Sequence, residues 1–253
     1  MSPAERRALI DALPAAMTEA ELAPSEGDAH FDAKVEGRET LRTHFERVSR
    51  RIYVGAELTV YYPDEDRFAP VLCAVTDVDP HPREKWVVSD EGKGIEWILE
   101  VLVRGDRQKD LERNRARYAR LRVPEYFVFD HRRNLLRGWR LPDRMIGIYH
   151  PIVPQQGVLR SEVLGLDLTL DGRKLRFRDG NAQLLAPQEI ITWMEDHVTD
   201  LVNAVEEAEQ RAEAEAKRAE AEAKRAEAEA KRAEAAERRV QELEAELRRA
   251  RGE

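Results

Sequence analysis

The sequence predicts a mixed α/β (α+β) domain that is followed by a long C-terminal helix. Two apolar segments, 97–103 and 124–130, flank a polar segment of helical composition, which is typical of a strand–helix–strand crossover in a sheet. After residue 187 the chain becomes rich in Ala, Glu, Lys and Arg. We therefore expect three parts: an N-terminal helical segment over 1–35, a sheet domain over 36–186, and a long charged helix over 187–253.

Composition narrows the classes of function. The 253 residues carry a net charge of −8, which argues against strong overall attraction to nucleic acid but leaves room for a local basic patch. Cys73 is the only cysteine, so the chain can form neither an internal disulfide nor a thiolate zinc site. Because no stretch of 18 apolar residues occurs, we expect a cytoplasmic protein with no membrane partner.

The first 52 residues contain two predicted helices. Ser2 and Glu5 have the spacing of a capping box, and Pro3 occupies the first helical position, which predicts a helix that ends near Pro14. A second helix is predicted over 38–52. The apolar stripe of the first helix is Leu9, Ile10 and Leu13, and that of the second is Leu41, Phe45, Val48 and Ile52.

The sheet domain should begin with a hairpin. Segments 57–62 and 71–78 are rich in β-branched and aromatic residues and flank the polar run 63–67, so we expect the two to pair as neighbouring strands. The later predicted elements are a strand over 95–103, a helix over 107–122, a strand over 126–130, and shorter strands over 135–140, 144–149, 166–170 and 175–178.

The tail follows one heptad register. One seam position holds Val198, Val205, Ala212, Ala219, Ala226, Ala233, Val240 and Leu247. The other holds Leu201, Ala208, Glu215, Glu222, Glu229, Ala236, Leu243 and Ala250. A coiled coil needs apolar residues at both positions, so the ends of this seam should associate and its centre should not.

Local interactions should keep the centre of the tail helical. Glutamate precedes lysine by four residues in three successive repeats, and each such pair contributes about 0.2–0.5 kcal/mol. Two interpretations stay open. The tail is either a solvated spacer or a helix that binds a second copy, or a partner helix, through residues 198–250.

Glu100 is the best candidate for a functional residue, because a carboxylate within an apolar strand must be paired or bound to a metal. Glu96 points to the same face but lies about 13 Å away along a strand. On the following helix Asn114 and Tyr118 fall in the stripe that should face the sheet, and Asp110 lies one turn earlier. An inward polar residue beside a strand carboxylate is typical of a metal-dependent hydrolytic site.

The same helix is rich in arginine. Arg113 and Arg117 are candidates for contacts with phosphate groups, since arginines at a helix surface often bind them. The alternative is a solvated face on which acidic neighbours pair with the arginines.

These residues together resemble the Uma-two family of restriction endonucleases, within the PD-(D/E)XK nuclease superfamily. The resemblance runs from about residue 36 to 179. It is carried by Glu100-Val101-Leu102, Asp110, the segments 118–121 and 123–130, and the shorter runs 68–70 and 161–167. It implies a restriction-endonuclease-like mixed central sheet flanked by helices. It also implies Mg²⁺-dependent hydrolysis of a DNA phosphodiester.

The family pattern implies three catalytic positions, and this sequence keeps one. Glu100 matches the glutamate that binds Mg²⁺. The aspartate position, which follows Pro70, is Val71, and the lysine position, four residues before Tyr118, is Asn114. Other branches of the superfamily keep their lysine where Leu102 stands here.

The nearest substitutes for the missing groups are poorly placed: Asp64 falls in a polar turn, Asp77 at the far end of a strand, and Lys109 on another side of the helix. The resemblance therefore implies an endonuclease whose activity is weakened or absent. The alternative is a non-catalytic interaction or scaffold protein that acts through its C-terminal helix.

Overall fold

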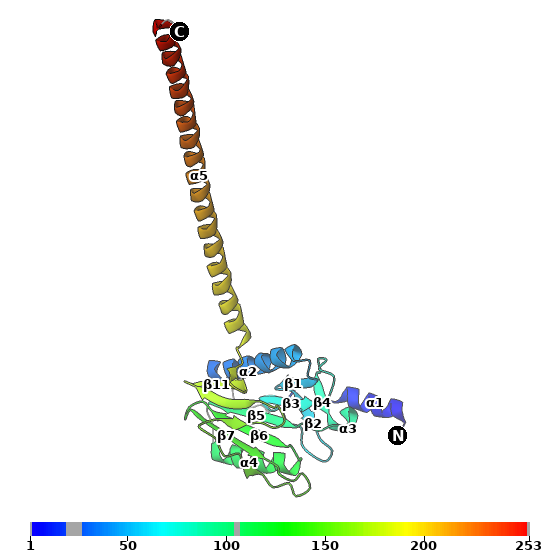
Figure 1. Ribbon diagram of the computed structural model, residues 1–253. Helices are drawn as coiled ribbons and strands as arrows, with labels where there is room; N and C mark the ends of the chain where they lie inside the picture. The colour runs from blue at the N-terminus through cyan, green and yellow to red at the C-terminus, as the bar shows by residue number, and fades with distance from the viewer. Residues whose placement is uncertain (1, 19–26, 104–106, 252–253) are drawn as a thin grey trace. The chain divides into compact units, whose positions relative to one another are not determined.

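The computed structural model describes residues 2–18, 27–103 and 107–251, and the side chains of 107–110, 246 and 249–251 lie outside the description. The chain forms two compact units, Met1–Ile190 and Ile191–Glu253. The first unit contains the sheets and their covering helices (Figure 1). The second consists of one helix.

The centre of the first unit is a six-stranded mixed sheet with the order β1-β3-β5-β6-β7-β8. Only β5 and β6 run parallel, and α4 (Arg107–Arg120) is the crossover that joins them. The strands are β1 (Ile52–Ala56), β3 (Leu72–Thr76), β5 (Trp97–Leu102), β6 (Glu125–Asp130), β7 (Leu135–Arg140) and β8 (His150–Pro151). The predicted mixed central sheet, with its strand–helix–strand crossover, is confirmed.

Two smaller sheets accompany the central one. A parallel pair joins β2 (Thr59–Tyr61) to β4 (Lys85–Val87), and the short helix α3 (Val88–Glu91) follows. An antiparallel sheet has the order β12-β11-β10-β9. Its strands are β9 (Leu159–Arg160), β10 (Asp167–Asp171), β11 (Lys174–Asp179) and β12 (Ala182–Gln183).

Alternating side chains of the central sheet fill two apolar clusters, one on each face, as strand geometry requires. The first, which we call the α2-face cluster, packs the sheet against α2 (Asp28–Arg47) and β10–β11. Its largest members are Phe45, Trp97, Phe127, Phe129 and Phe177. The second, the α4-face cluster, packs it against α4, β2 and β4, with Tyr53, Trp86, Ile98, Tyr118 and Tyr126.

Helix α1 (Pro3–Ala12) begins with the predicted capping box. The amide of Glu5 donates to the Ser2 hydroxyl at 3.2 Å, and the Ser2 amide donates to the Glu5 carboxylate at 2.7 Å. The predicted apolar stripe is only partly correct. Ile10 is buried, but Leu9 is 61% exposed, because few residues of the first unit cover this helix.

The second predicted helix was misplaced. Helix α2 ends at Arg47, five residues before the predicted end, and Ser49 takes a left-handed conformation with φ of 54°. Ile52 belongs instead to β1, where it pairs with Thr76. Ile52 follows Val48 by four positions, so its spacing is the same as that of a residue on the apolar face of a helix. The pairing of β1 with β3 shows that it belongs to a strand.

The predicted hairpin between 57–62 and 71–78 is wrong. Strand β3 pairs with β1, and β2 pairs in parallel with β4. Glu57, which separates β1 from β2, has φ of 48°, so the chain turns between them and only the first strand stays beside β3. The error arose because both β1 and β2 have strand composition and only one can be the neighbour of β3.

One further predicted strand differs from the expectation. Segment 144–149 forms no strand and exposes Met145, Ile146 and Ile148. The division expected at residue 35 falls inside α2. The three-part division of the chain stays a prediction.

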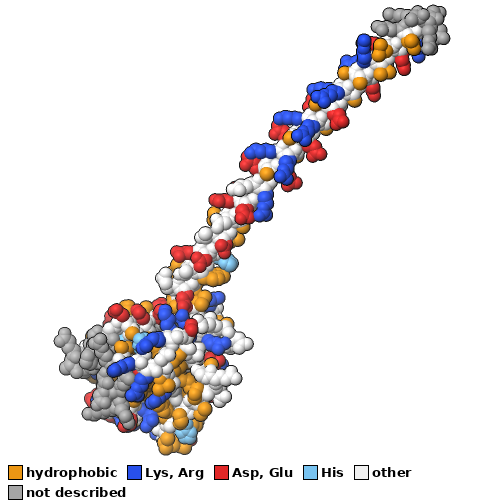
Figure 2. All heavy atoms as spheres, turned by 90° about the vertical axis from the view of Figure 1, so that its left-hand side faces the viewer, with side chains coloured by type: hydrophobic (Ala, Val, Ile, Leu, Met, Phe, Trp, Pro, Cys, Tyr) orange, Lys and Arg blue, Asp and Glu red, His pale blue; other side chains and the backbone are white. Residues whose placement is uncertain are grey.

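The second unit is formed by α5 (Pro187–Arg251), whose first turn belongs to the first unit. The predicted long C-terminal helix is confirmed. Positive and negative side chains alternate along it (Figure 2). The expected pairs form: Lys217–Glu213 at 2.7 Å, Lys224–Glu220 at 2.6 Å and Lys231–Glu227 at 2.7 Å. Within the described part of the chain, no helix combines the length and the apolar character needed to cross a membrane.

Candidate functional site

Glu100 lies on β5 and accepts hydrogen bonds from Tyr118 on α4 and from Val71, which precedes β3. The Tyr118 hydroxyl donates to Oε1 at 2.7 Å, and the backbone N–H of Val71 donates to Oε2 at 3.3 Å. The register of β3 and β5 pairs Leu72 with Leu99, so Val71 lies opposite Glu100. The structure thus brings the residue in the aspartate position to the glutamate.

The Tyr118 hydroxyl is the hydrogen-bond donor in its contact with Glu100. Its ring is buried in the α4-face cluster, and burial, followed by the charge of Glu100, raises the pKa of its hydroxyl well above 10.0. The hydroxyl therefore keeps its proton at neutral pH. This explains how a carboxylate in an apolar strand is tolerated.

Replacing Tyr118 with Phe should lower the free energy of unfolding by about 1.5–3 kcal/mol, because the lost hydrogen bond has a charged acceptor. The matched control is Tyr149→Phe, which removes a 2.8 Å bond to the uncharged carbonyl of Val123 and should cost about 1 kcal/mol. Urea unfolding measures both. A smaller loss for Tyr118→Phe than for the control would contradict this role of Tyr118.

The residues at the other two positions of the pattern expected from the sequence, Val71 and Asn114, have side chains that are neither carboxylates nor cations. The Val71 side chain is 8% exposed and packs in the α2-face cluster, so this residue offers Glu100 only its amide. Asn114 is half-buried on α4, one turn before Tyr118 on the same side of the helix. The side chains of Asp110 and Lys109 lie outside the described residues.

These residues do not fit Mg²⁺, which prefers several oxygen ligands in octahedral geometry. Of the described side chains at this site, Glu100 is the one carboxylate, and both of its oxygens accept hydrogen bonds. Among the side chains that the structure describes, no cluster of three or more His, Cys, Asp or Glu residues could hold a metal ion. We derive no chemical step through a metal here.

Glu96 directly precedes β5 and has its own partners. Its Oε2 accepts from the Thr76 amide at 2.8 Å and the Thr76 hydroxyl at 2.6 Å, and Lys93 Nζ lies 3.2 Å away. Burial raises the pKa of Glu96, but the hydrogen bonds from Thr76 and Lys93 outweigh it and hold the pKa below 4.5. Asp77 also lies close to Lys93, at 4.0 Å. The structure therefore does not bring Glu96 or Asp77 to Glu100.

The two arginines proposed as phosphate contacts differ. Arg113 is exposed on α4. Arg117 Nε lies 2.9 Å from Oε1 of Glu65, its NH2 group donates to the Asp66 carbonyl at 2.7 Å, and its guanidinium lies 4.8 Å from the centre of the Phe68 ring. Arg117 thus fastens the turn 63–67 to α4. Sequence spacing along α4 did not show this partner, because Glu65 belongs to a distant segment.

The ion pairs of Glu65 should make the free energy of unfolding depend on pH. Hydrogen bonds from Arg120 and Arg117 hold its pKa below the usual value. A lowered folded-state pKa stabilises the protein above the unfolded-state value of about 4.3, and that stabilisation is lost as the pH falls through the folded-state pKa. Urea unfolding of Glu65→Gln between pH 7 and pH 3 should therefore show a smaller acid-induced loss than the wild type.

The control for this measurement is Asp64→Asn, in the same turn. Asp64 is exposed and has φ of 59°, a conformation that asparagine tolerates. We expect its acid profile to follow the wild type. A wild-type profile for Glu65→Gln would contradict the role of this ion pair.

Glu125 is a buried charged residue that the sequence interpretation missed. It is 1% exposed, and its Oε1 accepts from Arg140 Nε and from the Glu162 amide, both at 2.8 Å. Its Oε2 accepts from the Ser161 hydroxyl. The sequence could have indicated Glu125 by the same argument as Glu100, because it is a carboxylate at the start of the apolar strand β6. It connects two segments that carry the family resemblance, 123–130 and 161–167.

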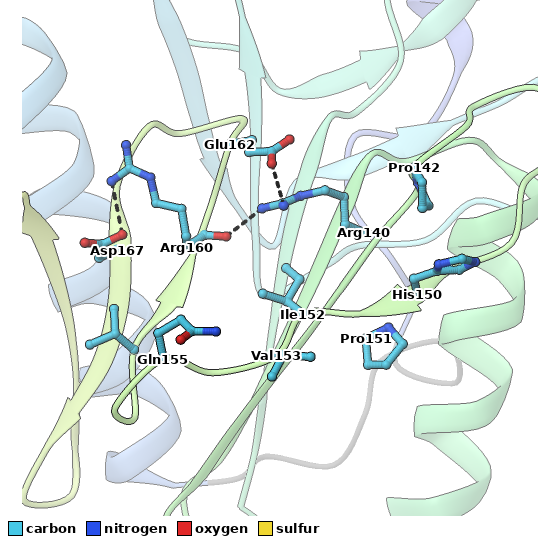
Figure 3. A pocket seen from close by; sticks show the side chains of 11 residues that line it. Arg140, Pro142, His150, Pro151, Ile152, Val153, Gln155, Arg160, Glu162 and Asp167 are labelled. Atoms are coloured by element: carbon cyan, nitrogen blue, oxygen red, sulfur yellow. Dashed lines mark hydrogen bonds and ion pairs between the residues drawn. The ribbon is translucent and has the colours of Figure 1, made fainter.

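A cavity of about 750 Å³ in the first unit is lined by residues other than Glu100. Its charged groups pair with one another (Figure 3): Arg140 with Glu162 at 2.6 Å, and Arg160 with Asp167 at 3.0 Å. We therefore keep Glu100 and its neighbours as the candidate site.

Comparison with known proteins agrees with the resemblance seen in the sequence. The model of the Uma2 (Uma-two) family, described as "Putative restriction endonuclease", matches residues 18–172. A crystal structure of a "putative nuclease belonging to DUF820" from Anabaena variabilis ATCC 29413 is similar, with 11% sequence identity and a TM-score of 0.43. That match covers 57% of this chain and 76% of the other. No curated protein matches the chain. Since the family model spans more than half of the sequence, the chain belongs to the Uma2 family.

Proposed function

We propose that this protein is a PD-(D/E)XK-type endonuclease relative whose Mg²⁺-dependent cleavage of DNA is weakened or absent. Membership of the Uma2 family supports descent from a nuclease. The observation that carries the loss is the pairing of Glu100 with the Val71 amide, at the position where the family pattern has a second carboxylate. At this position the protein offers Glu100 a hydrogen-bond donor, where the family pattern offers a carboxylate ligand for the metal.

The missing groups account for the expected loss. In metal-dependent hydrolysis the bound ion activates water and stabilises charge on the phosphate, and the protein must fix that ion. One carboxylate that already accepts two hydrogen bonds fixes it poorly. Asn114 in the lysine position adds no positive charge to offset that of the phosphate.

A plasmid-nicking assay with Mg²⁺ or Mn²⁺ tests this proposal. The wild type and Glu100→Ala should nick at the same background rate. Robust cleavage by the wild type that Glu100→Ala abolishes would overturn the proposal and make this an active endonuclease.

DNA remains the proposed ligand of the first unit. Arg113 and Arg115 are both exposed on α4. Contacts with phosphates release counterions, so binding should weaken steeply as salt increases. Binding of duplex DNA that is insensitive to salt would exclude phosphate contacts as its basis.

A second candidate function is that of a non-catalytic interaction or scaffold protein acting through the tail. It is favoured by the large apolar side chains that α5 exposes, among them Val198, Leu201 and Leu247. Removal of residues after about 200 should then abolish association while leaving the first unit folded. A full-length chain that associates with nothing would count against it.

A further inference from the structure

Helix α5 exposes a row of large apolar side chains within the second unit. Ile191, Met194, Val198, Leu201 and Val205 follow one another at alternating steps of three and four residues and are 47–62% exposed. Val240, Leu243 and Leu247 continue the same heptad register and are 49–54% exposed. Side chains of this size on a regular seam indicate that another helix covers them.

The kinds of side chain on the seam specify the number and direction of the helices. Ile191, Val198 and Val205, at the first seam position, are β-branched, and Met194 and Leu201, at the second, are not. β-Branched residues at the first position with leucine at the second favour two parallel helices. A second copy of the same chain supplies this pattern in register.

Charges beside the distal seam complement one another in the same arrangement. In a parallel pair, the residue before the first seam position faces the residue that lies five places later in the other copy. This places Arg232 against Glu237, and Arg239 against Glu244, of the other copy. An antiparallel pair would instead place arginine against arginine and glutamate against glutamate.

The middle of the helix cannot pair in this way. The second seam position there is glutamate, and the first is alanine, so equal charges would meet across the axis without apolar burial. The glutamates are Glu215, Glu222 and Glu229. Pairing is therefore confined to the two ends.

We propose that two copies of this chain form a parallel, in-register coiled coil that is paired over residues 191–208 and 232–247 and open between them. This interface is independent of the proposed nuclease function, since it involves only the second unit. It joins the N-terminal ends of the two α5 helices, so that each assembly carries two Uma2 units.

The mass of the full-length protein in solution tests the interface. We expect light scattering to give about 58 kDa, twice the 29.1 kDa of one chain. Leu201→Lys, on the seam, should raise the dissociation constant at least about tenfold, because burial of two leucine side chains is lost. Asn203→Lys, on the outer face of the same turn, is the matched control and should leave the dimer intact. A mass of one chain at all concentrations would overturn the proposal.

Direction is tested with one added cysteine. Ala208→Cys lies on the seam, and in a parallel dimer the two copies of residue 208 meet and should form a disulfide on mild oxidation. Asn203→Cys, on the outer face, should remain uncrosslinked. The native Cys73 is buried, and burial raises its pKa to about 12, so it does not compete. A dimer in which Ala208→Cys fails to crosslink would overturn the parallel arrangement.

A variant that is expected to strengthen the dimer is needed as well, because a weaker dimer could also result from unfolding of α5. Ala236→Leu enlarges the apolar contact at a second seam position inside the paired segment 232–247 and should lower the dissociation constant at least about tenfold. An unchanged constant would contradict the register. Association with a different protein by a chain that stays monomeric alone would also overturn the second copy as the occupant.

Discussion

A variant that carries both Val71→Asp and Asn114→Lys should nick plasmid DNA in Mg²⁺ at least about a hundredfold faster than the wild type, since a single positioned catalytic group typically contributes that much. Aspartate at 71 adds a carboxylate to the residue that precedes β3 and whose amide donates to Glu100. Lysine at 114 adds a cation one helical turn before Tyr118. The double variant thereby restores the three groups of the family pattern.

The thermal unfolding temperature of the double variant should test the same site without a cleavage assay. Val71 is 8% exposed, so a carboxylate there loses hydration and should lower the thermal unfolding temperature in the absence of metal. A metal that binds only the folded state stabilises it, so Mg²⁺ or Mn²⁺ should raise that temperature in the double variant.

The matched control is Val71→Asn with Asn114→Met, which has similar volumes but adds neither a carboxylate nor a cation. It should lack both the nicking activity and the metal-dependent stabilisation. Adding Glu100→Ala to the restored variant should abolish its activity. A restored variant that folds but shows neither effect would contradict the assignment of Val71 and Asn114 to catalytic positions.

Glu125→Ala should lower the free energy of unfolding by about 3 kcal/mol or more, because removing one partner of a buried ion pair leaves the other groups unsatisfied. The groups left behind are the Arg140 guanidinium, the Ser161 hydroxyl and the Glu162 amide. The effect should appear as a lower urea midpoint with an unchanged slope.

Glu162→Ala is the control, because Glu162 also binds Arg140, at 2.6 Å, but its side chain is 69% exposed. An exposed ion pair contributes about 0–1 kcal/mol, so this variant should be nearly neutral. Equal losses for the two variants would show that burial of Glu125 does not decide its contribution.

The crossover from β5 through α4 to β6 was predictable, because a single continuous stretch of sequence encodes it. Hydrophobic patterning gave both strands and the helix to within a few residues. The partners of β1, β2 and β3 were not predictable, since strands of similar composition compete for the same neighbour. Only the turn at Glu57 and the packing against α2 decide between them.

The candidate site was also predictable only in part. The cost of burying a charge singled out Glu100, and helical spacing placed Tyr118 and Asn114 on its side of α4. The bond from the Val71 amide depends on the register of β3 and β5, which the sequence leaves open. The partners of Arg117 and Glu125 come from segments distant in the chain, so local spacing could not reveal them.

Direct titration of the wild type and of Glu100→Ala with Mn²⁺ tests the central claim, that protein donors hold Glu100 and leave it without the ligands of a metal site. Calorimetry should give indistinguishable heats for the two proteins. A saturable site in the wild type that Glu100→Ala eliminates would contradict the account.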